Sequence, residues 1–242
     1  MSDLIFGIHS LEEALNSGQE IDKIFIQKGL DNPGISKIIS IAHKKLVPTS
    51  FVPIQRLNRM TPNNHQGVVA KISPIQTQEL EEMVEIAFAE NPAPLFVLLD
   101  EITDVRNFGA IIRTAECAGA HGIIIPKQGS AAINDQTVKT SAGAIFNIPI
   151  AKADHLKDAI YFLKSYDVQI VSATEKADTL LYEIDFKKPT AIIMGSEGKG
   201  ISPALLKMSD AQAALPLIGK TESLNVSVAS ALFLYEAVRQ RL

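Results

Sequence analysis

Several features are scarce in this chain of 242 residues. It has one cysteine, no tryptophan and few aromatic residues (6%), and no apolar run approaches the roughly 18 residues that a membrane-spanning helix needs. The single cysteine, Cys117, excludes an intramolecular disulfide and a cysteine-based zinc site, which fits a reducing compartment. No basic segment followed by a long apolar one opens the chain, so no signal peptide is expected. We therefore expect a cytoplasmic globular protein that does not associate with membranes.

A strong charge of one sign is also lacking, because the net charge is only −4. Residues 1–73 carry eight basic and six acidic side chains, whereas residues 74–94 carry five acidic side chains and no basic ones. The first 73 residues are therefore mildly basic. This allows a polyanionic partner such as a nucleic acid but does not require one.

Residues 1–73 predict a small α/β domain. The Ser10-Leu-Glu-Glu13 spacing is that of a capping box and predicts a helix that begins at Ser10. Hydrophobic periodicity predicts another helix over 35–46, a helical turn over 54–60, and strands over 23–27, 49–52 and 67–72. Residues 56–67 form a polar loop with two arginines and several amides, and two interpretations remain open for it: a solvated connection and an RNA contact.

Residues 74–94 predict a helix and a linker. Apolar residues fall on one face of 79–90 and acidic residues on the other, as in an amphipathic helix. Asn91-Pro-Ala-Pro94 ends it, because proline restricts both itself and the residue before it. We therefore expect three parts: a domain over 1–73, a helix and linker over 74–94, and a second domain over 95–242.

The second domain alternates between short apolar runs and helical stretches. This alternation predicts a mostly parallel sheet covered by helices on both faces, and such sheets bind ligands at the carboxyl ends of their strands. The expected strands are 95–99, 122–125, 148–151, 168–171, 191–194 and 213–216, and the expected helices are 110–119, 136–145, 154–166, 203–207 and one that begins near Ser223 or Asn225.

Three loops follow predicted strands and have unusual compositions, so they could meet at one edge of the sheet. They are residues 100–113, 194–200 and 215–229. The glycines of 194–200 fit neither a phosphate-binding P-loop nor a dinucleotide-binding motif, which leaves a small-molecule site and a tight turn as open interpretations. Ser223 and Asn225 are likewise open between helix capping and function.

Metal and nucleophile chemistry receive little support. The five histidines show no metal-ligand spacing, so no metal site is expected. Cys117 lies in an apolar helical stretch, where a buried, inert thiol is the expected state and a catalytic thiol the alternative.

In order and spacing, the three loops resemble the signature motifs of the SpoU (TrmH-type) RNA 2′-O-ribose methyltransferases of the SPOUT superfamily. The segments that carry the resemblance are Asn107-Phe-Gly-Ala-Ile-Ile-Arg113, Met194-Gly-Ser-Glu-Gly-Lys-Gly200 and Leu215-Pro-Leu with Ser223-Leu-Asn-Val-Ser-Val-Ala229. The opening, Phe6-Gly-Ile-His-Ser-Leu-Glu-Glu-Ala-Leu15, is similar to the ribosomal-protein-like substrate domain of bacterial enzymes that methylate a guanosine in 23S rRNA.

The resemblance implies a knotted (trefoil) sheet, an exception to the rule that chains do not thread loops, and a homodimer with the active site at its interface. S-adenosylmethionine would be the cofactor, no metal would be needed, and the partner would be RNA. The implied cofactor-binding residues are Gly195, Leu215, Leu217 and Leu224, and the implied catalytic residues are Asn107, Arg113, Glu197, Ser223 and Asn225. The family proposal makes Arg113 the base, but a guanidinium is essentially always protonated, so binding of a phosphate and stabilisation of the alkoxide is the alternative.

The RNA would be contacted by residues of the polar loop and by the residue that precedes the first motif, namely Arg56, Arg59, Asn64, His65, Gln66 and Arg106. Two other functions stay open beside methylation of 23S rRNA: methylation of a tRNA ribose, and RNA binding without catalysis. The N-terminal domain favours rRNA, and the complete set of motif residues favours an enzyme.

Overall fold

The computed structural model describes residues 4–242, and residues 1–3 of the expected first domain lie outside this range. The chain forms two compact units, which we call the N-terminal unit (chiefly residues up to Gln76) and the C-terminal unit (most of Thr77–Leu242). No helix within residues 4–242 has the length and apolar character needed to cross a membrane.

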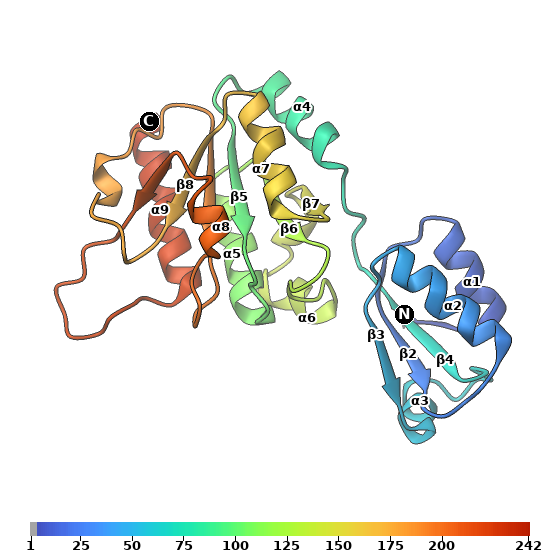
Figure 1. Ribbon diagram of the computed structural model, residues 1–242. Helices are drawn as coiled ribbons and strands as arrows, with labels where there is room; N and C mark the ends of the chain where they lie inside the picture. The colour runs from blue at the N-terminus through green and yellow to red at the C-terminus, as the bar shows by residue number, and fades with distance from the viewer. Residues whose placement is uncertain (1–3) are drawn as a thin grey trace. The chain divides into compact units, whose positions relative to one another are not determined.

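The N-terminal unit is a mixed four-stranded sheet with helices on both faces (Figure 1). The strand order is β1-β4-β2-β3, with β4 antiparallel to β1 and β2, and β2 parallel to β3. The elements are β1 (Leu4–Phe6), α1 (Ile8–Asn16), β2 (Ile21–Gln27), α2 (Pro33–Lys44), β3 (Thr49–Val52), α3 (Ile54–Met60) and β4 (Val68–Ile72).

Alternation along β2 explains why both faces of this sheet are covered. Ile24 and Ile26 are fully buried in the cluster that α1 and α2 complete, whereas Phe25 packs with Leu57 of α3 on the opposite face. Successive side chains of a strand point to opposite faces, so three consecutive apolar residues serve two separate cores.

The first helix begins earlier than the capping-box spacing predicts. That prediction is wrong: α1 starts at Ile8, and Ser10 makes no cap. Gly7, with φ of +87°, precedes the helix, and the N–H of Ile8 donates to Oε1 of Gln66 at 2.9 Å. Because the cap comes from a residue 58 positions away, the local sequence does not reveal it.

The C-terminal unit is a six-stranded sheet in which every pairing is parallel. Its order is β10-β8-β9-β5-β6-β7. The strands are β5 (Leu95–Leu99), β6 (Gly122–Pro126), β7 (Ile150–Ala153), β8 (Gln169–Ala173), β9 (Thr190–Met194) and β10 (Ala211–Ala213). The predicted mostly parallel sheet is confirmed, with the last strand two residues earlier than expected.

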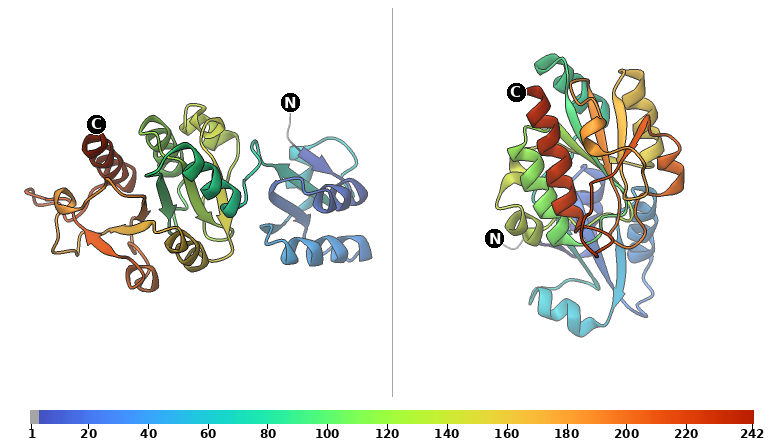
Figure 2. Two further views of the ribbon diagram at one scale, coloured as in Figure 1. Left: turned by 90° about the horizontal axis from the view of Figure 1, so that it is seen from above. Right: turned by 90° about the vertical axis from the view of Figure 1, so that its left-hand side faces the viewer.

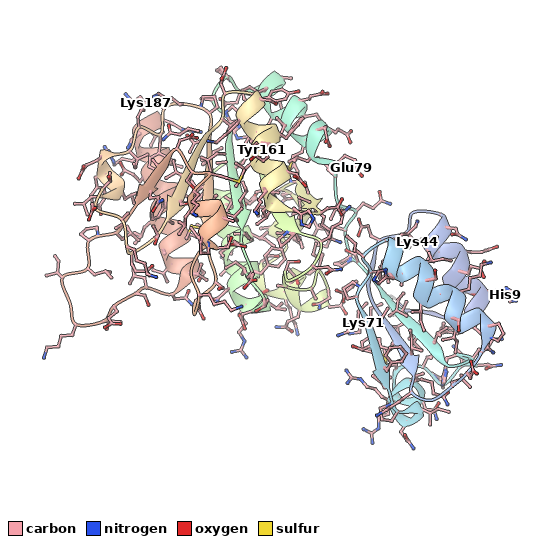
Figure 3. All side chains as sticks on the ribbon, viewed as in Figure 1. His9, Lys44, Lys71, Glu79, Tyr161 and Lys187 are labelled. Atoms are coloured by element: carbon pink, nitrogen blue, oxygen red, sulfur yellow. The ribbon has the colours of Figure 1, made fainter. Side chains whose placement is uncertain are left out.

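Helices cover both faces of this sheet, as Figures 1 and 2 show. On one face α5 (Val105–Cys117) packs beside α9 (Val226–Arg241); the other carries α4 (Leu80–Glu90), α7 (Leu156–Ser165) and α8 (Pro203–Leu206). Met83 of α4 and Leu163 of α7 share a buried cluster with Phe96 of β5. Tyr161, on the outer side of α7, is 67% exposed (Figure 3), so this helix buries one face and exposes the other.

Two helical boundaries in this unit differ from the predictions. Helix α5 starts at Val105 rather than Ala110, because the carboxylate of Asp104 accepts from the N–H groups of Arg106 and Asn107, each at 2.9 Å. The helix expected over 136–145 is divided into α6 (Asp135–Thr140) and a 3₁₀ turn, η1 (Ala144–Phe146). Ala142 and Gly143 separate them with positive φ, a backbone conformation that a helix cannot contain.

Cys117 is exposed, which corrects the expectation of a buried thiol. The buried residues of α5 are Phe108, Gly109, Ile111, Ile112 and Ala115. Cys117 is the last residue of the helix and lies outside this buried set, so the apolar sequence around it does not bury it.

The C-terminal helix is tied to the unit by Arg241. Its guanidinium donates to the carbonyl oxygens of Phe186 (2.8 Å), Ala93 (2.8 Å) and Lys188 (2.9 Å). Burial lowers the pKa of this guanidinium from its ordinary value. One side chain thus joins the end of α9 to the segment before β5 and to the loop before β9.

We expect Arg241→Met to destabilise the protein, because three carbonyl groups lose a charged donor. The free energy of unfolding should fall by about 2 kcal/mol, and the midpoint of thermal unfolding, followed by circular dichroism, by about 5 °C. Lys207→Met removes the same charge from an exposed position and is the control. Equal midpoints for the two variants would contradict the role given to Arg241.

Candidate active site

A pocket of about 450 Å³ lies beyond the carboxyl ends of β8, β9 and β10. Its walls come from three stretches: 173–176 after β8, 194–200 at the end of β9, and residues between Ala213 and Phe233. This is the edge at which a parallel sheet is expected to bind a ligand. The predicted meeting of the second and third loops at one edge of the sheet is confirmed.

Gly195 permits the sharp return of the 195–200 loop. A Cβ atom at this position would overlap the backbone of Gly200 and Ile201. Ser196 and Gly200 exchange two backbone hydrogen bonds, of 3.2 and 2.9 Å, which close the turn. The tight-turn interpretation of the glycines is therefore confirmed, and the loop also borders the pocket.

The pocket combines apolar walls with an unused polar group. Leu215, Leu217, Leu224 and Phe233 line it. The hydroxyl oxygen of Ser196, which also lines it, is buried and has no hydrogen-bond partner among residues 4–242. Buried polar atoms normally have partners, so the pocket suits a ligand with both apolar and polar parts.

The amide of Asn225 connects all three loops. Its Oδ1 accepts from the N–H groups of Ser227 (3.0 Å) and Val228 (3.4 Å), which caps α9, so the capping interpretation of Asn225 is confirmed. Its Nδ2 donates to Oδ1 of Asn107 at 3.0 Å and to Oε1 of Glu197. Three of the expected catalytic residues therefore lie in direct contact, and Ser223 lines the adjacent pocket.

Acidic residues at the end of β5 strengthen the junction between the first and second loops. Asp100 is buried, and its Oδ2 accepts from the N–H of Ser202 at 2.7 Å. Glu101 has a φ of +54° and pairs with Lys199 at 3.1 Å. Both partners of this ion pair are exposed, so it contributes at most about 1 kcal/mol. Sequence reasoning missed these contacts, and the only signal was the position of both acids at the end of a strand.

Arg113 does not reach the pocket formed by its own chain. It is an exposed residue of α5, does not line the pocket, and makes no hydrogen bond or ion pair with residues 4–242. Arg106 is exposed on the same helix, and its backbone N–H caps the first turn. The structure thus brings Asn107, Glu197 and Asn225 together but leaves Arg113 outside their cluster.

The predicted RNA-contacting residues of the N-terminal unit divide into two groups. His65 is 8% exposed, and both of its ring nitrogens are used: Nδ1 accepts from the N–H of Gly67 (3.0 Å) and Nε2 donates to Asn58 (2.8 Å). It therefore positions the loop and has no ring nitrogen left for RNA, which revises its expected role. Arg59, Asn64 and Gln66 are exposed, and so is Arg56, whose guanidinium lies over the ring of Phe25.

With this geometry in view, comparison with known proteins assigns the chain to a family. Residues 94–235, more than half of the chain, match the SpoU rRNA Methylase family. The chain belongs to this family. Residues 4–78 of this SpoU protein match a second family, described as RNA 2′-O ribose methyltransferase substrate binding.

Relatives of known name cover nearly the whole SpoU chain. A putative TrmH family tRNA/rRNA methyltransferase, YacO of Bacillus subtilis, is 34% identical over 99% of this chain and 96% of its own. The 23S rRNA (guanosine-2′-O-)-methyltransferase RlmB of Pseudomonas aeruginosa is 33% identical over 98% and 96%. Among solved structures, the AdoMet-bound rRNA methyltransferase of Sinorhizobium meliloti is similar with a TM-score of 0.63 at 28% identity, covering 99% of this chain and 87% of that one.

Gly195→Ala should disturb the pocket of this SpoU protein, because the added methyl group overlaps backbone that cannot move aside. We expect a loss of about 1–3 kcal/mol in the free energy of unfolding, with faster amide hydrogen exchange at Ser196 and Gly200. Gly198→Ala is the matched control, since nothing lies within 4 Å of a Cβ atom there. If the two variants behaved alike, the close approach at Gly195 would not be what shapes the loop.

Proposed function

We propose that this protein transfers a methyl group from S-adenosylmethionine to a ribose 2′-hydroxyl in RNA, at a guanosine of 23S rRNA. The observation that carries this proposal is the junction at Asn225, which joins the residues of three SpoU motifs beside a pocket of mixed character. In this proposal residues 1–73 bind the RNA substrate, 74–94 form a helix and linker, and 95–242 form the SPOUT methyltransferase domain, with its carboxyl-terminal part knotted as a trefoil.

The pocket fits the cofactor by its chemistry. Leu215, Leu217 and Leu224 provide apolar contacts for an adenine ring, and main-chain groups near Gly195 supply polar ones. The buried Ser196 hydroxyl lacks a partner among residues 4–242 and can bond to a polar group of the ligand. When bound, S-adenosylmethionine supplies an electrophilic methyl group on a sulfonium, so the reaction needs an aligned oxygen nucleophile and no metal ion.

The side chains around the pocket act on the RNA. A ribose hydroxyl is a weak acid and loses its proton as it attacks, so the site must stabilise a developing negative charge. Arg113 stays protonated and suits this task together with binding of the adjacent phosphate. Ser223 is free to orient the ribose, whereas Asn107, Glu197 and Asn225 hold one another in place and thereby fix the loops that surround it.

We further propose a homodimer in which Arg113 serves the pocket of the partner subunit. Helix α9 is apolar beyond its buried face: Val228, Leu232 and Tyr235 are 49%, 43% and 50% exposed and recur at helical spacing. Such a stripe on a helix is typical of an interface. Because α5 packs beside α9, a second copy that covered this stripe would lie close to Arg113.

Among substrates, rRNA is favoured over tRNA by the N-terminal unit, which matches a substrate-binding family and presents Arg56, Arg59, Asn64 and Gln66 in one region. Arg106 adds a basic contact near the first motif. This substrate would place the protein with the ribosome in the cytoplasm. A non-catalytic RNA-binding protein would have no need of the ordered Asn107, Glu197 and Asn225 cluster.

Methyl transfer tests this function directly. Labelled S-adenosylmethionine is supplied with unmodified 23S rRNA and, separately, with unmodified tRNA, and the labelled nucleotide is mapped. We expect label at one ribose of the rRNA. Label in tRNA would overturn the proposed substrate, and label in neither RNA, nor in an assembling subunit, would overturn the proposed activity.

Arg113→Ala should abolish turnover while leaving the affinity for S-adenosylmethionine nearly unchanged, because Arg113 does not line the pocket. The expected loss in kcat is at least about 100-fold, the usual effect of removing a group that stabilises a developing anion. Calorimetry gives the cofactor affinity of the same preparation and checks its folding. A large loss of cofactor affinity would contradict the assigned role.

A mixed dimer tests the shared site. Arg113→Ala and Gly195→Ala subunits carrying different tags are coexpressed, and the heterodimer is purified. If the pocket of one subunit uses Arg113 of the other, one complete site remains and about half of the wild-type activity returns. An inactive heterodimer would show that each subunit relies on its own Arg113.

A further inference from the structure

A groove of about 640 Å³ on the N-terminal unit is lined by an unusual number of amide side chains. Three of them lie in the loop that joins α3 to β4, and the others lie on α3, at the end of β2 and just before α2. The six residues are Gln27, Asn32, Asn58, Asn63, Asn64 and Gln66. We propose that this groove binds one unstacked guanine or uracil base of the RNA. The inference rests on the proposed function and specifies how the N-terminal unit recognises its substrate.

The amides are held so that they present donors. Oδ1 of Asn32 accepts from the N–H of Gly34 at 2.8 Å, and Oε1 of Gln66 accepts from the N–H of Ile8 at 2.9 Å. Backbone N–H groups can only donate, so they fix which end of each amide is the oxygen. The NH₂ groups at the other ends have no partner among residues 4–242.

Two more amides are fixed in the same way. Because Nδ1 of His65 accepts from the N–H of Gly67, its Nε2 carries the proton and donates to Oδ1 of Asn58. Oδ1 of Asn64 accepts from the N–H of Gln66 at 3.3 Å. Four carbonyl oxygens thus each accept a hydrogen bond within the unit, which fixes their orientation, and four NH₂ groups stay available to a ligand that brings acceptors.

This arrangement selects among the bases. Guanine presents two acceptors, O6 and N7, on one edge, and uracil presents carbonyl oxygens. On the corresponding edge adenine presents one acceptor beside an amino group and cytosine presents an amino group, and these amino groups would face the NH₂ groups of the protein, donor against donor. Sequence-specific recognition of RNA usually targets unpaired bases whose edges are accessible in this manner.

The groove fits a base better than a phosphate. Among residues 4–242 no lysine or arginine lines it, so a phosphate would enter without a charged partner. Leu30 and Ile54 do line it, and they are 37% and 41% exposed, which offers apolar contact to the face of a flat ring. Arg56 and Arg59, on the same helix as Ile54, remain available for the flanking phosphates.

Binding of defined RNA hairpins tests the proposal with the full-length protein. The hairpins share one stem and differ only in their loops, which consist of uridine, adenosine or cytidine, or of adenosine with one guanosine. Fluorescence anisotropy at one fixed salt concentration gives each affinity. We expect the uridine loop and the guanosine-containing loop to bind about 10-fold more tightly than the other two.

The variant Asn32→Asp removes the NH₂ donor of Asn32 and keeps the oxygen that caps α2. Aspartate caps a helix as well as asparagine does, so α2 is retained, while the NH₂ group becomes an acceptor. We expect this variant to lose the preference for uridine and guanosine. Gln19→Glu adds the same charge at an exposed position outside the groove and should keep the preference. Asn58→Asp, which keeps the acceptor for His65, is a second test of the same kind.

Equal affinity of the wild-type protein for all four hairpins would overturn the base-binding groove, and so would a preference that survives in both Asn32→Asp and Asn58→Asp. Methyl transfer to rRNA is measured separately on the wild-type protein. Absence of transfer to any RNA would overturn the proposed function. The hairpin affinities would still decide whether the groove binds a base.

Discussion

The site depends on a single amide group. Asn225 uses its oxygen to begin α9 and its nitrogen to hold Asn107 of α5 and Glu197 of the 195–200 loop, which lie 118 and 28 residues away in the chain. An amide is suited to this position because it accepts and donates at once, whereas a carboxylate could cap the helix but would face Glu197 with a like charge. The relative positions of the three motifs therefore depend on an asparagine at position 225.

That junction exists because of the order of the strands. The sheet places β9 beside β5, so the loops that leave these two strands are neighbours although almost a hundred residues separate them. Asp100 and Glu101 at the end of β5 then reach Ser202 and Lys199 beyond β9. A parallel sheet collects the carboxyl ends of its strands at one edge, and this is what allows distant motifs to form one site.

Sequence patterns predicted the elements of this protein better than their ends. Short apolar runs located all six strands of the C-terminal unit because a strand buried on both faces needs a run of apolar residues wherever it pairs. The start of α1 was missed because its partner, Gln66, belongs to a distant loop. The Glu101–Lys199 pair was missed for the same reason, since only the strand order brings its members together. Motif spacing predicted the meeting of the loops, but it could not show that His65 is enclosed by Asn58 and Gly67.

The strand order also affects the protein while it is being made. Among residues 4–242, strand β8 pairs only with β9 and β10, and both follow it in the chain. During synthesis β8 therefore leaves the ribosome before either neighbour exists, with its apolar residues Ile170 and Val171 unpaired. Exposed strands of this kind associate readily with other chains. The topology that assembles the site thus leaves a period of translation in which β8 has no partner strand.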